Sequence, residues 1–217
     1  MQHRELVARP YAHRGLHRPG GPVENSLAAV EAAVLAGFGV EVDVRLSADG
    51  VAVVHHDASL RRITGDRRRV HDLTAAELGR LRLGDSDQAV PRLVEVLDLV
   101  AGRAPVLLDV KVGFRAADRL QIVAEVARLT AARDDPVAVV SFDPWLLAAV
   151  AEQSPSVWRG QSAGVALAPV LRALWPIAHP VDGLWFNRVS RPQFVTFNVD
   201  RLPHRAAARA RGRLAVL

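Results

Sequence analysis

The 217-residue sequence predicts an α/β fold of the TIM (β/α)8 barrel type, formed as a single domain over residues 1–217. Short valine-rich runs alternate with longer segments that have helical periodicity, which is the pattern of βα units around a mostly parallel sheet. Glycine-rich phosphate loops of the GxGxxG or P-loop type do not occur in the sequence, which disfavours a nucleotide-binding doubly wound sheet.

The first elements follow from their apolar runs and end signals. A strand is expected to end at His13, and a helix is expected over residues 24–37, with Asn25 as its N-cap and Gly37 as its stop. Apolar runs at 38–44 and 51–57 predict the second and third strands.

The later elements continue the alternation. Helices are expected at 72–81, 90–102, 114–133, 144–153 and 204–212, with Asp72 or Thr74 capping the first of them and Pro144 opening the helix at 144–153. Strands are expected at 105–111, 136–143, 157–163, 194–199 and 213–217.

The connection between the second and third strands is too short for a helix. About seven residues separate Asp43 from Val51, whereas a parallel crossover normally needs a dozen or more. Either an extended return replaces the helix, or the two strands are antiparallel with a turn at Asp49–Gly50. Both alternatives leave a barrel that lacks a helix between strands 2 and 3.

Composition narrows the class of protein. Half of the residues are hydrophobic, and cysteine is absent, which excludes disulfides, a thiolate zinc site and a cysteine nucleophile. The first residues have no apolar leader, and no stretch reaches the ~18 apolar residues of a membrane span, so a cytoplasmic protein without stable membrane insertion is expected. The net charge of +5 comes from scattered arginines with few aromatic neighbours, which does not predict nucleic-acid binding.

Polar side chains repeatedly stand at the carboxyl ends of the predicted strands, where the active site of a barrel forms. Five strand ends share this property: His13 and Arg14, Glu41 and Asp43, His56 and Asp57, Asp109 and Lys111, and Ser141 and Asp143. Any one of these residues could be a cap or a surface group, but together they favour a functional site.

The residue types indicate the chemistry. Glu41, Asp43 and Asp109 alternate with apolar residues, and clustered buried carboxylates repel one another unless a cation neutralises them. Oxygen ligands favour Mg²⁺ or Ca²⁺ over zinc. Arg14 and Lys111 would suit an anionic substrate such as a phosphate.

Two histidines and one lysine complete the candidate site. His13 and His56 titrate near neutrality and can act as general acid and base in metal-assisted cleavage of a phosphate ester. Lys111 is the only lysine among 28 basic residues, which either is chance or indicates that a compact ammonium is needed at that position.

The ordered motifs resemble those of the glycerophosphodiester phosphodiesterase family. The matching stretches are "AHRG", "PVENSLAAVEAA", "VEVDVRLSADGVAVVHHDASLRRITG", "VPRLVEVLDLV", "LLDVKVG" and "SFDP", which span roughly residues 10 to 145. The related phosphatidylinositol-specific phospholipases C share the E-x-D-x-R and histidine pattern, but "HRG", "EN" and "SFDP" fit the diesterases better.

The resemblance implies a TIM barrel that hydrolyses a glycerophosphodiester to sn-glycerol 3-phosphate and an alcohol. It implies that Glu41 and Asp43 bind the metal, with Asp109 where the family usually has a glutamate. His13 and His56 match the acid–base pair, without indicating which is the acid. The remaining matches concern phosphate or substrate: the cations Arg14 and Lys111, Glu24 and Asn25 of a "PEN" element in which Val23 is inserted, and Phe142 near the rim.

The C-terminal third departs from this family, whose members usually continue beyond a strand such as 213–217. We therefore expect a barrel incomplete at its C-terminus, with truncation as the favoured reason and closure by fewer strands or by a partner as alternatives. A catalytically inactive or truncated phosphate-ligand-binding module is the alternative function. The alcohol headgroup, the metal and the oligomeric state are left open.

Overall fold

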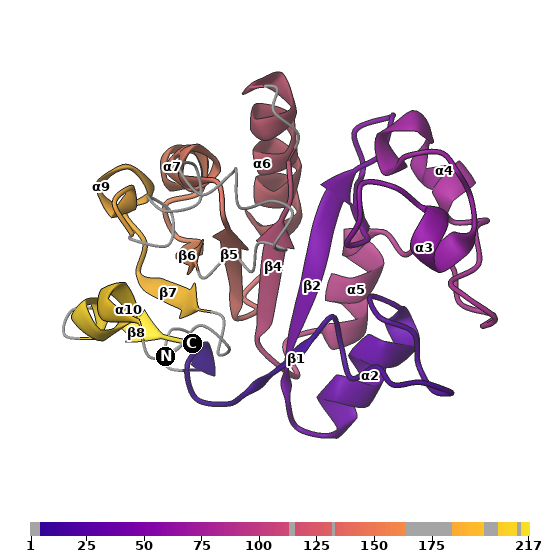
Figure 1. The fold of residues 1–217 in the computed structure, drawn as a ribbon, viewed down its shortest axis with the longest axis horizontal. Helices are drawn as coiled ribbons and strands as arrows, with labels where there is room; N and C mark the ends of the chain where they lie inside the picture. The colour runs from indigo at the N-terminus through magenta and orange to yellow at the C-terminus, as the bar shows by residue number, and fades with distance from the viewer. Residues whose placement is uncertain (1–4, 113–115, 132, 164–183, 198–203, 212–213) are drawn as a thin grey trace. The chain divides into compact units, whose positions relative to one another are not determined.

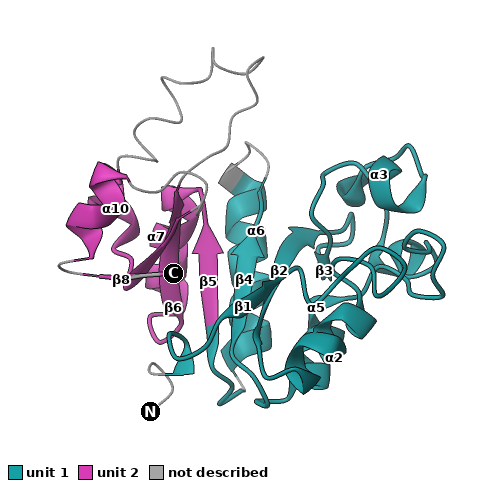
Figure 2. Ribbon diagram, turned by 60° about the horizontal axis from the view of Figure 1, so that its bottom comes forward, with its two compact units in different colours: residues 1–137 teal, residues 138–217 magenta. Residues whose placement is uncertain are grey.

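The structure is a computed structural model that describes residues 5–112, 116–131, 133–163, 184–197, 204–211 and 214–217 (Figure 1). The chain divides into two compact units, residues 1–137 and residues 138–217 (Figure 2). Of the residues predicted for the candidate site, Phe142 and the strand-end residues Ser141 and Asp143 belong to the second unit, and the others belong to the first.

The sheet of unit 1 is centred on strand β2 (Gly39–Leu46), which pairs in parallel with β1 (Tyr11–His13) and with β4 (Val106–Val110) (Figure 1). The register places His13 opposite Glu41 and Asp43 opposite Asp109. Three valines of β2 (Val40, Val42 and Val44) are fully buried, as β-branched residues in a covered sheet should be. The strand pairing thus brings chemistry-bearing residues of three strands to one end of the sheet.

Strand β3 (Ala52–Val54) pairs antiparallel with β2, which decides between the two alternatives for the short connection. The turn is held by Ser47, whose backbone N–H donates to the carbonyl of Val51 at 3.0 Å and whose hydroxyl donates to Asp49 at 2.6 Å. Gly50 has a φ of +76°, which glycine adopts without strain. The predicted lack of a helix between these strands is confirmed.

Helices α2 (Leu27–Leu35) and α5 (Leu93–Val100) pack against each other beside β2 and β3 (Figure 2), and α6 (Ala116–Ala131) also contacts these strands. The N-cap of α2 is Ser26, whose hydroxyl accepts from the N–H of Ala29 at 3.1 Å, so the prediction of Asn25 as N-cap was wrong by one residue. Asn25 is instead used to bind Asp43, as described below.

The segment between β3 and α5 forms three short helical elements: α3 (Arg61–Thr64), the 3-10 helix η1 (Val70–Asp72) and α4 (Ala75–Leu78). The helix predicted over 72–81 is therefore much shorter. Thr74 is its cap, because its hydroxyl accepts from the N–H of Glu77 while the Glu77 carboxylate accepts from the N–H of Thr74. Leu60, Leu78 and Leu83 of this segment are buried in one apolar cluster.

Unit 2 contains a second run of parallel strands, which are β5 (Val137–Ser141, all but its first residue), β6 (Trp158–Ala163), β7 (Phe194–Phe197) and β8 (Ala215–Val216). Its helices are α7 (Pro144–Gln153), α9 (Asn187–Ser190) and α10 (Arg205–Ala210). Asp143 caps α7 and Pro144 is its first residue, as predicted. Within the described ranges, no helix combines the length and apolarity that crossing a membrane requires.

Candidate active site

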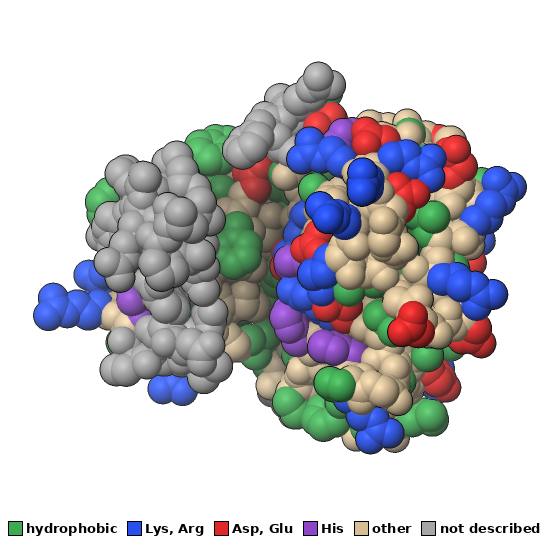
Figure 3. Space-filling model, turned by 45° about the vertical axis from the view of Figure 1, so that its right-hand side comes forward, with side chains coloured by type: hydrophobic (Ala, Val, Ile, Leu, Met, Phe, Trp, Pro, Cys, Tyr) green, Lys and Arg blue, Asp and Glu red, His purple; other side chains and the backbone are tan. Residues whose placement is uncertain are grey.

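Three carboxylates gather at the carboxyl ends of β2 and β4. Glu41 and Asp43 are two residues apart on β2 and therefore share a face, and Asp109 lies opposite Asp43 on β4. One oxygen from each of the three lies within 4.8 Å of the others. Figure 3 shows histidine side chains beside acidic and basic ones on one face of the molecule.

Burial makes this cluster electrostatically costly. Asp43 is 0% exposed and Glu41 is 9% exposed. Burial, together with the charges of Asp43 and Asp109, raises the pKa of Glu41 to about 8. Burial also raises the pKa of Asp109, although Lys111 opposes it. The cluster therefore favours a bound positive charge.

The donor set fits a hard divalent cation. Ca²⁺–oxygen distances are ~2.3–2.6 Å, so two oxygens on one ion can be up to ~5 Å apart. The 4.8 Å spread of the three oxygens is within that limit. All three donors are carboxylates, which suits Mg²⁺ or Ca²⁺ better than a thiolate- or imidazole-preferring metal.

Lys111 bridges two members of the cluster. Its ammonium donates to Asp109 Oδ2 at 2.7 Å and lies 2.9 Å from Asp43 Oδ1. Burial lowers the pKa of Lys111, but Asp109 and Asp43 outweigh it, and the net shift is upward. A compact ammonium can contact both carboxylates from a single nitrogen, which gives a physical reason for lysine at this position.

Arg14 contacts both carboxylates of β2. Its backbone N–H donates to Glu41 Oε2 at 2.8 Å, and its Nε lies 3.3 Å from Asp43 Oδ2. Its guanidinium also donates to Glu24 Oε1 at 3.0 Å. Arg14 has a φ of +59°, a conformation that is uncommon for a non-glycine residue and that concentrates at functional sites.

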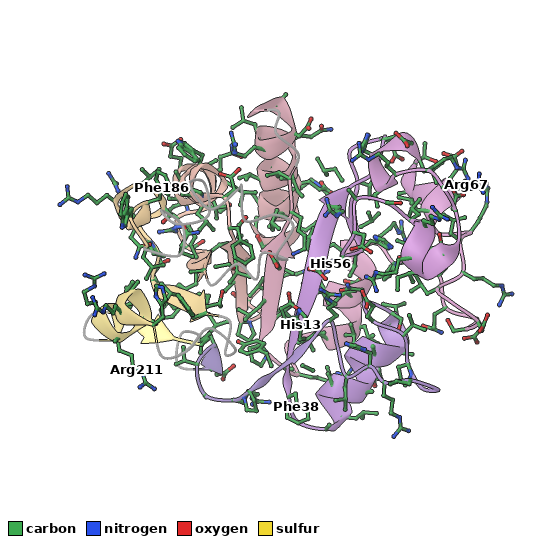
Figure 4. The ribbon with its side chains drawn as sticks, viewed as in Figure 1. His13, Phe38, His56, Arg67, Phe186 and Arg211 are labelled. Carbon is green, nitrogen blue, oxygen red and sulfur yellow. The ribbon has the colours of Figure 1, made fainter. Side chains whose placement is uncertain are left out.

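His13 and His56 both lie beside strand β2 (Figure 4). His13 ends β1 opposite Glu41, and burial followed by Arg14 lowers its pKa below the ordinary value. His56 follows β3. Burial opposes ionisation of Asp43, but Lys111 outweighs it and lowers the pKa of Asp43.

The ring of His56 is oriented by Asp57. His56 Nδ1 lies 2.6 Å from Asp57 Oδ1. Burial opposes ionisation of Asp57, but hydrogen bonds from Arg62 and His56 outweigh it and lower its pKa to about 2. Because an ionised carboxylate can only accept, Nδ1 carries the proton and Nε2 is left to exchange one. Arg45 holds the same turn by donating from Nε to the carbonyl of His56 at 2.8 Å.

The neighbouring His55 is buried, and its hydrogen bonds hold the backbone around the site. Its Nδ1 lies 2.8 Å from the carbonyl of Asp57, so it donates to that oxygen. Burial lowers its pKa. Its backbone N–H donates to the carbonyl of Asp43, which ties the end of β3 to β2.

Glu24 and Phe142 were also predicted for the site, and their surroundings differ from those of the other predicted residues. Glu24 is paired with the guanidinium groups of Arg14 and Arg62, so its carboxylate faces cations of the protein. Phe142 follows β5 in unit 2 and is 41% exposed. The sequence reasoning missed Arg62, which bonds both Glu24 and Asp57 and lies in a short helix without periodic signal.

Unit 1 is thus an α/β unit with a carboxylate cluster, two histidines and two cations near the ends of its strands, and its three carboxylates could hold a metal ion. The model of the glycerophosphoryl diester phosphodiesterase family matches residues 13–171, and the chain belongs to that family.

Individual relatives agree with this membership. A glycerophosphodiester phosphodiesterase of Bacillus altitudinis is 36% identical over 111 residues, which cover 46% of this chain and 43% of that protein. The chain thus spans less than half of the first curated relatives that it matches.

Solved structures are similar over nearly the whole chain. The glycerophosphodiester phosphodiesterase of Agrobacterium tumefaciens is 26% identical with a TM-score of 0.69, covering 96% of this chain and 84% of that one. A phosphodiesterase of Oleispira antarctica, solved with its product sn-glycerol-3-phosphate, has a TM-score of 0.68 at 22% identity and covers 96% and 91%. These similarities confirm the fold class predicted from the sequence.

Proposed function

We propose that this protein is a metal-dependent phosphodiesterase that hydrolyses glycerophosphodiesters to sn-glycerol 3-phosphate and an alcohol. The observation that carries the proposal is the carboxylate cluster of Glu41, Asp43 and Asp109, whose oxygens lie within 4.8 Å of one another beside Arg14 and Lys111. Membership of the family supports the substrate class.

Glu41, Asp43 and Asp109 would hold the divalent cation, Mg²⁺ or Ca²⁺. When bound, such an ion supplies Lewis-acid stabilisation of negative charge on a phosphate. Arg14 and Lys111 contribute positive charge beside the carboxylates and would bind and orient the phosphate of the substrate.

His13 and His56 would move the protons of the reaction. One would take a proton from the neighbouring glycerol hydroxyl as its oxygen bonds to phosphorus, and the other would donate a proton to the alkoxide whose bond to phosphorus breaks. Water would then open the cyclic phosphate, with the two histidines in exchanged roles, to give sn-glycerol 3-phosphate. His56 exchanges its proton at Nε2, because its Nδ1–H is held by Asp57. Glu24 and Phe142 are proposed to contribute to substrate binding. Glu24 would do so indirectly, by accepting a hydrogen bond from Arg14.

The proposal is tested by measuring glycerol 3-phosphate released from glycerophosphocholine, with Mg²⁺, with Ca²⁺ and with a chelator. We expect release with at least one ion and none with the chelator. His13→Ala and His56→Ala should each lower kcat by ~10²–10⁴-fold. His71→Ala is the matched control, because His71 is exposed and pairs only with its neighbour Asp72 among the contacts described.

Two outcomes would overturn the proposal. Full activity in the chelator would exclude metal dependence. Thermal stabilisation by the ion or by glycerol 3-phosphate without any turnover would instead favour the phosphate-ligand-binding module.

A further inference from the structure

We propose that Arg62 is a positioning residue that links the acid–base residue His56 to the phosphate-binding residue Arg14 through Asp57 and Glu24. The proposal rests on the function proposed above and assigns a role to residues outside its catalytic and metal-binding groups. It predicts that the guanidinium of Arg62 fixes the geometry of both the acid–base residue His56 and the phosphate-binding residue Arg14.

Arg62 uses its three guanidinium nitrogens on two carboxylates. Its Nε donates to Asp57 Oδ2 at 2.6 Å, and its two terminal nitrogens donate to the two oxygens of Glu24 at 2.7 and 2.9 Å. This bidentate geometry requires the planar fork of arginine, because the single ammonium of a lysine could not satisfy two carboxylates in this way.

The first branch leads to His56. Asp57 gives one carboxylate oxygen to Arg62 and the other to His56 Nδ1, and its carbonyl accepts from His55. Three contacts therefore fix Asp57, and Asp57 fixes the ring orientation and tautomer of His56. In acid–base catalysis, a carboxylate often accepts a hydrogen bond from one ring nitrogen of the histidine and so orients the imidazole.

The second branch leads to Arg14. Glu24 Oε1 accepts from Arg62 and also from Arg14 at 3.0 Å, and Arg14 reaches Asp43 at 3.3 Å. The side chain of Glu24 is only 13% exposed, so the pair is partly shielded from solvent. Glu24 thus connects the Arg62 guanidinium to the carboxylate cluster.

The position of Arg62 in the chain suits this role. It lies in α3, five residues after Asp57, where the buried Leu60 anchors the segment and Thr64 donates from its hydroxyl to the carbonyl of Leu60. The helix ends at Gly65 with a φ of +76°. Exposed ion pairs add little to stability, so the geometry that Arg62 imposes, rather than its stabilising energy, is the expected contribution.

The test compares Arg62→Ala and Arg62→Lys with Asp57→Asn and Glu24→Gln in the full chain, with glycerophosphocholine as substrate. Misplacement of a catalytic group should lower kcat of Arg62→Ala by ~10–100-fold. Asp57→Asn should mainly lower kcat, Glu24→Gln should mainly raise KM, and Arg62→Ala should do both. Adding Asp57→Asn to Arg62→Ala should cost kcat less than the two single effects combined.

Arg68→Ala is the matched control, because Arg68 makes a comparable bidentate ion pair with Asp66 in the same exposed segment. It should leave kcat, KM and the His56 signal unchanged. The readout that does not depend on turnover is the ¹⁵N NMR signal of His56. We expect the Nδ1–H tautomer in the native protein and a mixture of tautomers in Arg62→Ala and Asp57→Asn.

The outcomes separate the two proposals. If the native protein releases no glycerol 3-phosphate, the proposed function fails, and the His56 tautomer still tests Arg62. If the native protein is active and the Arg62 variants keep its kcat, KM and His56 tautomer, the positioning role of Arg62 is wrong. Should Arg62→Ala fail to fold, Arg62→Lys keeps the charge but loses the fork, and normal kinetics in that variant would contradict the proposal equally.

Discussion

Asn25 and Asp43 hold each other by two reciprocal hydrogen bonds. Asn25 Nδ2 donates to Asp43 Oδ2 at 2.8 Å, and the backbone N–H of Asp43 donates to Asn25 Oδ1 at 3.1 Å. Both side chains are buried, and Asn25 has a φ of +59°, a conformation that asparagine tolerates better than most residues. The turn before α2 is thereby fastened to the carboxylate cluster.

Asn25→Ala should therefore destabilise the protein. The loss of two buried hydrogen bonds, one of them to a carboxylate, and the strain of alanine at positive φ predict a fall of about 3 kcal/mol in the free energy of unfolding, measured in urea. Asn25→Gly removes the same hydrogen bonds without the backbone strain. It should therefore be about 1 kcal/mol more stable than Asn25→Ala, and equal stability of Asn25→Ala and the native protein would refute the linkage.

Gly15 provides a second test of the backbone around the site. Its φ is +77°, and a Cβ there would lie 2.7 Å from the backbone of Ala29, so Gly15→Ala combines strain with a clash. Gly20 is the matched control, because its φ is +70° but no atom lies within 4 Å of the position that an alanine Cβ would take. We expect Gly20→Ala to cost about 1 kcal/mol and Gly15→Ala about 1–3 kcal/mol more in urea unfolding.

Gly15→Ala should also lower kcat/KM, since Gly15 follows directly after His13 and Arg14. If Gly15→Ala and Gly20→Ala lower the free energy of unfolding equally, the close approach of Gly15 to Ala29 does not affect stability.

Lys111 is expected to be irreplaceable by arginine. Lys111→Met leaves Asp43 and Asp109 without their bridging cation and should lower the free energy of unfolding by about 3 kcal/mol without a divalent ion. Lys111→Arg keeps the charge and should retain more stability, but its wider head should lower glycerol 3-phosphate release by ~10²-fold or more. Native kinetics in Lys111→Arg would show that the ammonium is not specifically required.

The stability of the protein should fall in acid partly through Glu24. Hydrogen bonding from Arg62 and the charge of Arg14 outweigh burial and lower the pKa of Glu24 from 4.5 to about 2. Because the folded pKa is the lower one, this contribution is fully present above about pH 5 and is lost as the pH falls towards 2. After allowance for solvent screening, it should be about 1–2 kcal/mol.

Urea unfolding of the native protein and of Glu24→Gln at pH 6 and pH 2.5 measures this contribution. The difference between the two proteins should be largest at pH 6 and much smaller at pH 2.5. Glu152→Gln, at an exposed position of α7, serves as the control. A difference between the native protein and Glu24→Gln that does not change with pH would contradict the assignment.

Much of the fold followed from local patterns. The alternation of Glu41 and Asp43 with valines placed both carboxylates on one face, since side chains of a strand alternate with period 2. Pro144 and Asp143 marked the start of α7 because their roles at a helix N-terminus are local. The antiparallel pairing of β3 could not be decided locally, because it depends on which strand edge receives the chain.

The parts that the sequence did not predict depend on tertiary contacts. Asn25 and Ser26 are both good N-caps, and the hydrogen bonds of Asn25 to Asp43 decide that Ser26 takes the cap. Arg62 is one of many arginines, and its contacts with Asp57 and Glu24 exist only once α3 folds beside the turn after β3. The signal that could have found it is its place shortly after the His56–Asp57 pair, inside the same matched motif.

The central claim is that the cluster of Glu41, Asp43 and Asp109 binds a divalent cation on which turnover depends. The most direct measurement is the rate of glycerol 3-phosphate release from glycerophosphocholine as Mg²⁺ or Ca²⁺ is titrated into chelator-treated protein, for the native chain and for Asp43→Asn. We predict a saturable rise from zero in the native chain and no rise in Asp43→Asn. An undiminished rate before any ion is added, or the same titration curve for both proteins, would contradict the claim.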